Sequence, residues 1–305
     1  MFKQITIQFT SHCNLNCPYC FADHHTISNI TPSDFAYFYD FCKKNHLDNI
    51  HITGGEPFLH NEASQYIADL NKISDIVVYS NFTIPDIMHG IYPVKNELHF
   101  LVNINDLETY TSSQWAHLNQ NIEDALSRHV RITLSKTFYK KPYDLKTVFA
   151  LSTKFNIRRL RMSHSIPHSA IQNTSLSENE IQHLYNYIYS LKKEMYSHQI
   201  TRFYFDCPIK PCLLDAQFYQ KLLKENIIGS SCLPKVVLST DLNVYHCYIQ
   251  PNKPSHVLQD FRNFEDLHQS ISNQLRENAL FANRSDSCKV CSHHISETLC
   301  GCPYS

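Results

Sequence analysis

The chain contains, at residues 13–20, the sequence Cys13-Asn14-Leu15-Asn16-Cys17-Pro18-Tyr19-Cys20. Three thiolates in this CxxxCxxC spacing can bind three irons of a 4Fe-4S cube and leave the fourth iron open. A cluster that only stores electrons normally has four cysteine ligands. The spacing therefore predicts an iron-sulfur centre with one reactive iron.

The same cysteines are also compatible with a zinc site. Zinc in structural sites is bound by four ligands, and Cys and His together bind it readily. A neighbouring histidine, His12, His24 or His25, could supply the fourth ligand. The loop alone leaves both metals open.

The residues on either side of the cysteines indicate strands. Ile5-Thr6-Ile7-Gln8-Phe9 alternates apolar and polar residues, so the cysteine loop leaves the carboxyl end of a first strand. A second strand-like run, residues 49–52, leads into Gly54-Gly55-Glu56-Pro57, about one helix further along the chain. The carboxyl ends of parallel strands are where α/β folds place their active sites.

The two motifs together resemble the radical S-adenosylmethionine (SAM) superfamily, which has CxxxCxxC with an aromatic residue before the last cysteine and GGEP after the second strand. The resemblance implies that Cys13, Cys17 and Cys20 hold a 4Fe-4S cluster and that SAM chelates the fourth iron. It assigns the amino group of SAM to Gly54-Gly55-Glu56, the ribose to the end of the third strand and the carboxylate to the end of the fifth. The residues expected at SAM are Tyr19, Gly54, Gly55, Glu56, Ser80, Asn81 and Ser135, with Lys136 as a further candidate.

Hydrophobic periodicity predicts an α/β fold in which six strands alternate with helices. Helix–strand alternation implies a parallel sheet with right-handed crossovers. The resemblance adds that the sheet forms a partial (β/α)6 TIM-like barrel that is open on one side. The expected strands are residues 5–9, 49–52, 75–81, 98–104, 130–134 and 159–162, and the expected helices are residues 34–44, 61–73, 112–129, 144–155 and 177–198.

Eight of the twelve cysteines crowd into the C-terminal third, which we expect to be a small cysteine-rich α+β domain. We therefore divide the chain into a core, residues 1–203, and an auxiliary domain, residues 204–305. Residues 236–238 and 243–245 read as a hairpin, and residues 263–277 as a helix. This arrangement resembles the SPASM or Twitch extensions of radical SAM enzymes, although Leu242 stands where that pattern usually has glycine.

The resemblance implies one or two auxiliary 4Fe-4S clusters in this region. One cluster is expected on Cys232 and Cys247, completed by Cys212 and Cys302, and the other on Cys288 and Cys291, completed by Cys300 and Cys207. A structural zinc site is the alternative. It would use Cys288, Cys291, Cys300 and Cys302, or include His293 or His294.

Composition limits the classes of partner. The 305 residues carry a net charge of -1, which indicates neither a nucleic-acid partner nor a membrane surface. No apolar run approaches a membrane span and no signal peptide is apparent, so a cytoplasmic protein is expected. Only five glycines occur, which excludes a glycine-rich phosphate loop. Cys42, alone in a helical stretch, reads as a buried apolar residue.

The leading functional hypothesis is a radical SAM enzyme that modifies a ribosomally made peptide by crosslinking, epimerisation or oxidation. The resemblance implies reductive cleavage of SAM to a 5'-deoxyadenosyl radical, with an electron from a flavodoxin- or ferredoxin-type donor. Either a separate leader-binding protein presents the peptide or the barrel and tail bind it themselves. The alternatives are a radical SAM enzyme acting on a small metabolite and a non-catalytic metal or iron-sulfur scaffold.

Overall fold

The computed structural model describes the chain except for residues 1, 21–26, 167–172, 230–234, 248–255 and 282–305. Its core is one nine-stranded sheet with the order β7-β6-β5-β4-β3-β2-β1-β8-β9. All neighbouring strands are parallel except β8 and β9, which form an antiparallel hairpin. The strands are β1 (Gln4–Gln8), β2 (Asn49–Thr53), β3 (Asp75–Ser80), β4 (Leu98–Asn103), β5 (Arg131–Phe138), β6 (Arg159–His164), β7 (Arg202–Phe205), β8 (Val236–Leu238) and β9 (Val244–Tyr245).

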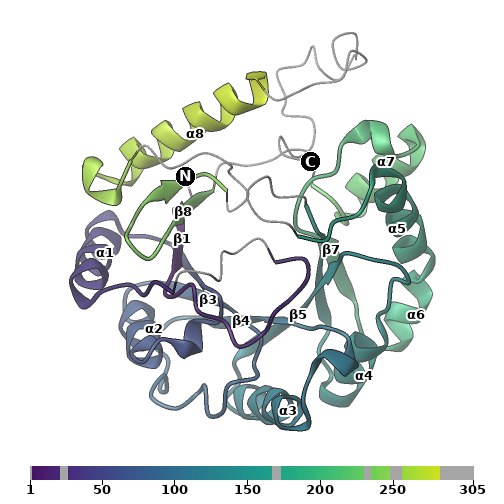
Figure 1. Cartoon of the computed structure of the whole chain (residues 1–305), viewed down its shortest axis with the longest axis horizontal. Coiled ribbons are helices and arrows are strands. Elements are labelled where there is room, and N and C mark those ends of the chain that lie inside the picture. Colours follow the sequence, from purple (N-terminus) through teal and green to yellow (C-terminus); the bar gives the residue numbers. More distant parts are fainter. Residues whose placement is uncertain (1, 21–26, 167–172, 230–234, 248–255, 282–305) are drawn as a thin grey trace.

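The helices form an outer layer around the curved sheet, and the sheet does not close, because β7 and β9 lie at its two ends (Figure 1). This confirms the predicted α/β fold with a partial barrel. The α-helices are α1 (Pro32–Asn45), α2 (Ala63–Asn71), α3 (Ser112–Ser127), α4 (Lys146–Phe155), α5 (Glu178–Ser190), α6 (Lys192–Ser197), α7 (Ala216–Lys224) and α8 (Phe264–Phe281).

Strand alternation separates an apolar face from a polar face of the sheet. Ile5, Ile7, Ile50, Ile52 and Val78 are completely buried. Since residues two apart on a strand share a face, these side chains pack beneath the helices. The intervening positions are more polar, as with Thr6, His51 and Tyr79. Apolar burial therefore fixes which residues face the inside of the barrel.

Local signals set the helix boundaries. Thr31 caps α1 by accepting a hydrogen bond from the Asp34 amide, and Pro32 occupies the first turn. Ser177 forms a capping box with Glu180 at the start of α5. The helix expected over residues 177–198 is divided at Leu191 into α5 and α6. Cys42 is 1% exposed, which confirms its reading as a buried residue.

The sheet continues beyond the six expected strands. β7 pairs in parallel with β6, and β8 pairs in parallel with β1. The boundary expected between residues 203 and 204 falls within β7, and the expected hairpin is part of the same sheet. The division into two domains stays a prediction.

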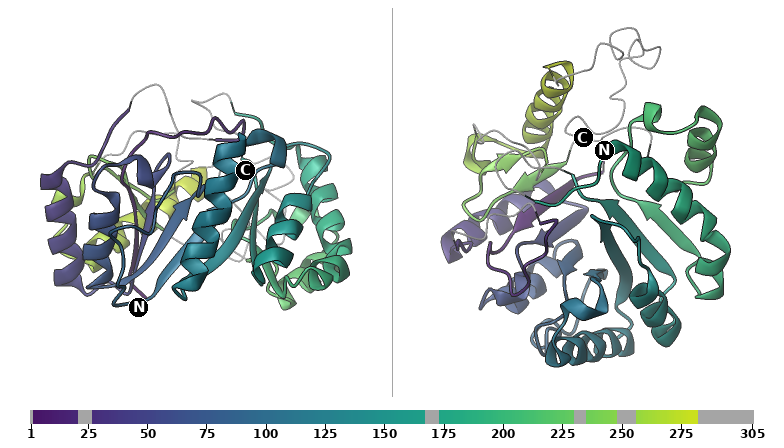
Figure 2. Two further views of the ribbon diagram at one scale, coloured as in Figure 1. Left: turned by 90° about the horizontal axis from the view of Figure 1, so that it is seen from below. Right: turned by 45° about the vertical axis from the view of Figure 1, so that its right-hand side comes forward.

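The hairpin turn contains Leu242, whose φ is +59° and whose side chain is completely buried. A left-handed conformation normally favours glycine, so burial of the leucine side chain offsets an unfavourable backbone conformation. Figure 2 shows α8, in yellow, beside the hairpin of β8 and β9. The Phe264 amide donates to Asn45 Oδ1 at 2.9 Å, and Lys3 pairs with Glu265 at 2.8 Å.

In the described residues, no helix is long and apolar enough to cross a lipid bilayer.

Candidate active site

The cysteine loop begins at the carboxyl end of β1 and is attached to the turn after β2. The Gly55 amide donates to the Thr10 carbonyl at 2.8 Å, and the Glu56 amide donates to the His12 carbonyl at 2.8 Å. These bonds extend the pairing of β1 and β2 up to the residue before Cys13. The first cysteine is therefore positioned by the GGEP turn.

The two glycines of this turn allow the close approach. A Cβ atom at Gly54 would lie 2.6 Å from the Thr10 carbonyl oxygen, and one at Gly55 would lie 2.2 Å from the His12 carbonyl oxygen. Contacts this short with backbone atoms cannot be relieved by a side-chain rotation. The structure thus gives Gly54 and Gly55 a role in holding the loop, whereas their predicted contact with the SAM amino group stays a prediction.

The side chain of Glu56 is completely buried and crosses from β2 to β3. Its carboxylate accepts hydrogen bonds from Ser80 Oγ at 2.9 Å, the Asn81 amide at 2.7 Å and the Phe58 amide at 3.3 Å. Burial raises the pKa of Glu56 to about 7, although these three hydrogen bonds lower it. In this structure Glu56 and Ser80 bind each other, so the carboxylate acts as an internal brace.

Asn81 connects the end of β3 to the cysteine loop. Its Nδ2 donates to Asn14 Oδ1 at 2.9 Å, and its Oδ1 accepts from the Thr83 hydroxyl at 2.6 Å. Asn14 Nδ2 in turn donates to Thr83 Oγ1 at 2.8 Å. Asn81 and Ser80 are each less than 7% exposed. The predicted contacts of these two residues with the SAM ribose stay a prediction.

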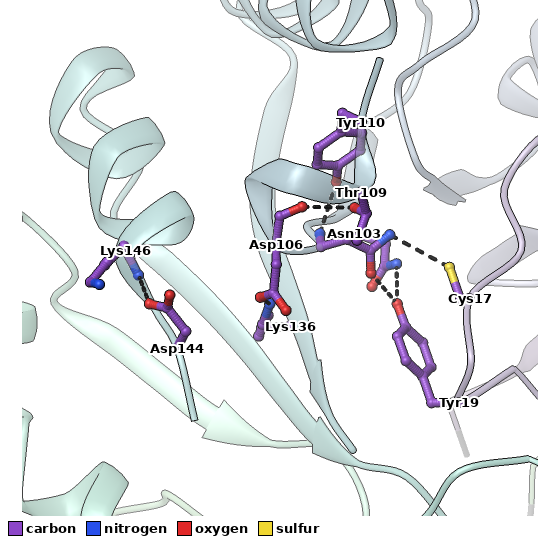
Figure 3. Close-up of polar contacts among 10 residues, drawn as sticks. Cys17, Tyr19, Asn103, Asp106, Thr109, Tyr110, Lys136, Asp144 and Lys146 are labelled. Atoms are coloured by element: carbon purple, nitrogen blue, oxygen red, sulfur yellow. Dashed lines mark hydrogen bonds and ion pairs between the residues drawn. The ribbon is translucent and has the colours of Figure 1, made fainter. Parts of the chain in front are cut away.

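Tyr19 lies in a polar network at the end of β4. Asn103 Nδ2 donates to the Tyr19 hydroxyl at 2.9 Å, and that hydroxyl donates to Asn105 Oδ1 at 2.6 Å. Asn105 Nδ2 lies 3.5 Å from Cys17 Sγ, within hydrogen-bonding distance of sulfur. Figure 3 draws these contacts as dashed lines around Cys17, Tyr19 and Asn103, with Tyr110 nearby.

A segment after β6 also contacts the cysteine loop. The Thr174 amide donates to the Pro18 carbonyl at 2.8 Å, and Asn173 Nδ2 lies 3.2 Å from the Tyr19 carbonyl. The turn after β2 and the chain beyond β6 bind backbone groups of the loop, and residues at the ends of β3 and β4 bind its side chains. The loop is fixed at several points before any cofactor is considered.

The donor set of the loop suits an iron-sulfur cluster. Its three thiols are partly exposed, Cys13 Sγ accepts from the Leu15 amide at 3.4 Å, and Cys17 Sγ accepts from Asn105 Nδ2 at 3.5 Å. Burial raises the pKa of the Cys13 thiol to about 12, the Leu15 amide opposes this, and the Glu56 carboxylate adds to it. A bound metal would be needed to keep that sulfur as a thiolate. Among the described residues, no three Cys, His, Asp or Glu side chains are already arranged around one ion.

Ser135 and Lys136 were expected to follow the fifth strand, but they lie within β5, which extends to Phe138, and both make polar contacts inside the protein. Lys136 Nζ lies 2.5 Å from Asp106 Oδ1 and is nearly buried, so its ammonium is paired within the protein. Ser135 Oγ accepts from Arg161 Nη1 at 2.9 Å. Contacts of Ser135 or Lys136 with the SAM carboxylate stay a prediction.

Arg161 belongs to a charged group inside the barrel. Its Nη2 lies 2.5 Å from Asp206 Oδ2, and Lys235 Nζ lies 3.8 Å from Asp206 Oδ1. Burial would raise the pKa of Asp206, but Arg161 and then Lys235 hold it well below its usual range. The same attraction raises the pKa of Arg161 although burial opposes it. No sequence motif predicted the ion pair between Arg161 and Asp206.

The C-terminal cysteines are only partly described. Cys207 follows β7, Cys212 lies in a short 3-10 helix (Pro211–Leu213), and Cys247 follows β9. The other five, Cys232, Cys288, Cys291, Cys300 and Cys302, lie outside the described residues. Auxiliary clusters and their ligands, and the zinc alternatives with His24, His25, His293 or His294, stay predictions.

The sequence analysis missed Asn14, Thr83, Asn103 and Asn105, all of which contact the loop or its neighbours. A signal was available, because Asn103, Asn105 and Asp106 follow a buried strand. The rule that drew attention to Ser80 and Asn81 at the end of β3 also applies at the end of β4.

Comparison with known proteins agrees with this arrangement. Residues 7–108, from β1 into the segment after β4, match the family model of the Radical SAM superfamily. A relative named probable GTP 3',8-cyclase, from Methanococcus aeolicus, is 34% identical over 87 residues, which cover 26% of this chain. The match spans only 29% of that relative's length.

Two solved structures share the fold over nearly the whole chain. SuiB from Streptococcus suis, bound to precursor peptide SuiA, has a TM-score of 0.69 and 12% sequence identity. The match covers 95% of this chain and 70% of the SuiB chain. The anSMEcpe protein with bound AdoMet and the Cp18Cys peptide has a TM-score of 0.69 and 15% sequence identity. The match covers 98% of this chain and 88% of the anSMEcpe chain. At these identities the likeness concerns the fold. SAM and one 4Fe-4S cluster are the cofactors that the matching domain supports.

Proposed function

We propose that the protein is a radical SAM enzyme whose cluster is held by Cys13, Cys17 and Cys20. The observation that carries this is the attachment of the cysteine loop to the Gly54-Gly55-Glu56 turn at the carboxyl ends of β1 and β2. When bound and reduced, a cluster held by these cysteines would supply the electron for cleavage of SAM to methionine and a 5'-deoxyadenosyl radical, which would abstract hydrogen from the substrate.

The protein's own residues position and enclose that chemistry. The glycines bring the loop against the barrel, Asn14 and Asn81 bind it to β3, and Asn103 and Asn105 bind it to β4. In the described part of the chain β7 and β9 do not pair, so the sheet is left open between them. This supports entry of a substrate larger than a metabolite.

The test is formation of 5'-deoxyadenosine after reconstitution with iron and sulfide and reduction in the presence of SAM. Wild type should form it, and Cys17→Ala should not. Cys42→Ala is the matched control, because Cys42 is buried in α1 and outside the loop. Undiminished formation by Cys17→Ala would refute the assignment, and no formation by wild type would favour the non-catalytic scaffold.

We infer that the substrate is a peptide. Support comes from the two fold neighbours, whose structures contain the precursor peptide SuiA and the Cp18Cys peptide. A second candidate is a small metabolite of the nucleotide class, which the name of the sequence relative, a probable GTP 3',8-cyclase, favours. Deuterium transfer separates them. A deuterated peptide encoded beside this gene should pass deuterium into 5'-deoxyadenosine, whereas transfer from a nucleotide and from no neighbouring peptide would decide for the metabolite.

The residues from 204 onward are proposed to carry one or two auxiliary 4Fe-4S clusters. From the four-iron stoichiometry, two auxiliary clusters would give roughly 12 irons per chain and one would give roughly 8. In a variant lacking Cys13, Cys17 and Cys20, the remaining metal should still be iron. Zinc in its place would support a structural zinc site.

Two partners complete the proposal. A flavodoxin- or ferredoxin-type protein would supply the electron, and a separate leader-binding protein could present the peptide. Each can be tested by adding the purified partner to the reconstituted protein and following the rate of 5'-deoxyadenosine formation.

A further inference from the structure

Asn105 reaches the cysteine loop from a different strand. It lies two residues beyond the end of β4 and is 7% exposed. Its side-chain Nδ2 donates toward Cys17 Sγ over 3.5 Å, a normal length for an N–H group donating to sulfur. By contrast, the donor to Cys13 Sγ is the Leu15 amide of the loop itself. The sulfur of Cys17 is thus bonded to a residue of the barrel.

The neighbours of Asn105 determine which end of its amide faces the sulfur. The Tyr19 hydroxyl accepts a hydrogen bond from Asn103 Nδ2, so its own proton is available to donate to Asn105 Oδ1, 2.6 Å away. An amide has its acceptor on one side and its two donors on the other. With the oxygen held by Tyr19, the NH₂ group must point toward Cys17.

The backbone of Asn105 is held separately. Its amide donates to the Tyr110 hydroxyl at 2.8 Å, and Tyr110 follows a short 3-10 helix (Leu107–Thr109). The relay Asn103–Tyr19–Asn105–Cys17 and the Asn105–Tyr110 bond therefore fix the side chain and the backbone independently, as the dashed lines around Tyr19, Cys17 and Tyr110 indicate (Figure 3). This separation allows the two effects to be tested apart.

We propose that Asn105 is a positioning residue that sets the reduction potential of the cluster held by Cys13, Cys17 and Cys20, by donating an N–H to the Cys17 sulfur. The inference rests on the proposed function. Adding one electron to a cluster increases the negative charge on its sulfurs, and an N–H donor stabilises that charge more in the reduced form. Hydrogen bonds to sulfur are among the features that set cluster potentials. The bond therefore makes the cluster easier for an external reductant to reduce.

Tyr19 orients the side chain of Asn105. The tyrosine before the last cysteine supplies, through its hydroxyl, the proton that orients Asn105. A phenylalanine at this position would keep the ring but leave the amide free to rotate, and its oxygen could then face the sulfur and repel the added charge. Burial raises the pKa of the Cys17 thiol, and the Tyr19 hydroxyl also forms a hydrogen bond with Cys17 that lowers it, so Tyr19 acts on the potential both directly and through Asn105.

The test is an EPR-monitored redox titration of the full, reconstituted chain, following the signal that changes when SAM is added. Asn105→Leu, which has a similar shape and no N–H, should shift the midpoint potential to more negative values. Tyr19→Phe should shift it in the same direction by less. Tyr110→Phe is the matched control: it removes the backbone bond of Asn105 and keeps the N–H at the sulfur, so it should retain the wild-type potential.

A wild-type potential in Asn105→Leu, with iron content or melting temperature lowered, would mean that Asn105 only braces the loop and would overturn the inference. If Asn105→Leu does not fold, Tyr19→Phe decides, since an unchanged potential there also overturns it. An equal shift in Tyr110→Phe would assign the effect to loop geometry and overturn it as well. Absence of any SAM-responsive iron-sulfur signal in wild type would instead overturn the proposed function together with this inference.

Discussion

The side-chain amide of Asn81 donates a 2.9 Å hydrogen bond to Oδ1 of Asn14, and so joins the end of β3 to the residue after the first cysteine. Thr83 bonds to both asparagines and closes the group. Because the three side chains satisfy one another, loss of one leaves buried polar atoms without partners. A cysteine loop of eight residues is thereby given a defined conformation.

Asn14→Ala should lower iron incorporation and the melting temperature, because it leaves the buried Asn81 amide unsatisfied, at a cost of about 1–3 kcal/mol. The control is Asn16→Ala, two residues along the same loop, whose side chain is exposed. Iron analysis after reconstitution and a thermal melt of each variant test this. Equal behaviour of the two variants would contradict the assigned role of Asn14.

Gly55→Ala should prevent normal assembly of the loop, because its Cβ would lie 2.2 Å from the His12 carbonyl oxygen and 2.6 Å from the Ser11 carbonyl oxygen. We expect a loss of about 3 kcal/mol or more in the free energy of unfolding, since backbone atoms must move. Gly90→Ala is the comparison, because a Cβ there meets only Ser64 Cβ, at 3.5 Å, although φ is +82°. Denaturant unfolding measures both. A smaller loss in Gly55→Ala than in Gly90→Ala would count against the close approach.

Glu56 should make stability fall as pH rises from about 4.5 to 7. Its pKa is raised to about 7 in the folded protein, so the folded state holds the proton more tightly than the unfolded chain, and the resulting stability is lost as pH increases. The difference amounts to about 3 kcal/mol. In urea unfolding across this range, the stability of wild type should fall relative to that of Glu56→Gln as the pH rises.

The control for Glu56 is Glu108→Gln, because Glu108 is exposed. It should show the wild-type pH dependence. The same fall in Glu56→Gln would mean that other groups titrate in this window. The buried His51, His99 and His164 have pKa values lowered to about 4 by burial and act with the opposite sign, so comparison with the variant is essential.

Arg161→Met should destabilise the protein by about 3–5 kcal/mol, because it leaves the Asp206 carboxylate buried with only Lys235 nearby. Arg128→Met is the matched control, since Arg128 pairs with Asp124 at the surface and its removal should change little. Chemical unfolding at pH 7 compares them. If both variants lose the same stability, the buried pair has no special role.

Leu242→Gly should destabilise the protein even though φ is +59° at this residue. Removing a completely buried leucine side chain costs about 2–5 kcal/mol, which exceeds the gain of about 1 kcal/mol from a permissive backbone. Gln199→Gly, at φ +72° on the surface after α6, should instead keep or slightly raise the melting temperature. A stabilised Leu242→Gly variant would contradict the account of the hairpin turn.

Much of the barrel could be predicted because its signals are local. The alternation of Ile5 and Ile7 or Ile50 and Ile52 defines strands, and Thr31-Pro32 or Ser177 with Glu180 defines helix starts. The two motifs, Cys13 to Cys20 and Gly54 to Pro57, could be recognised in the same way, and the structure brings them together. These features depend on a few neighbouring residues and so can be read from the sequence.

What the sequence could not supply depends on contacts between distant residues. β7 has only four residues, and its pairing with β6 follows a connection through α5 and α6. The bonds of Asn105 to Tyr19 and Cys17 join residues more than eighty positions apart. No periodicity encodes such pairs. The hydrogen bond between Glu56 and Ser80 likewise depends on the fold, because it joins the turn after β2 to the end of β3.

The pairing of β1 with β8 has a consequence for how the chain folds. Ile5 lies opposite Val236 in the sheet, so this contact closes a loop of roughly 230 residues, whereas Ile5 also lies opposite Ile50, only about 45 residues away. Contacts of high sequence separation form late, because their entropic cost is met only after nearby pairs have ordered the chain. During synthesis, β1 and β2 can associate long before β8 leaves the ribosome. The strand that precedes the cysteine loop therefore keeps an unpaired edge until the last part of the sheet arrives, and this edge is the place where a nascent chain of this protein is most exposed to aggregation.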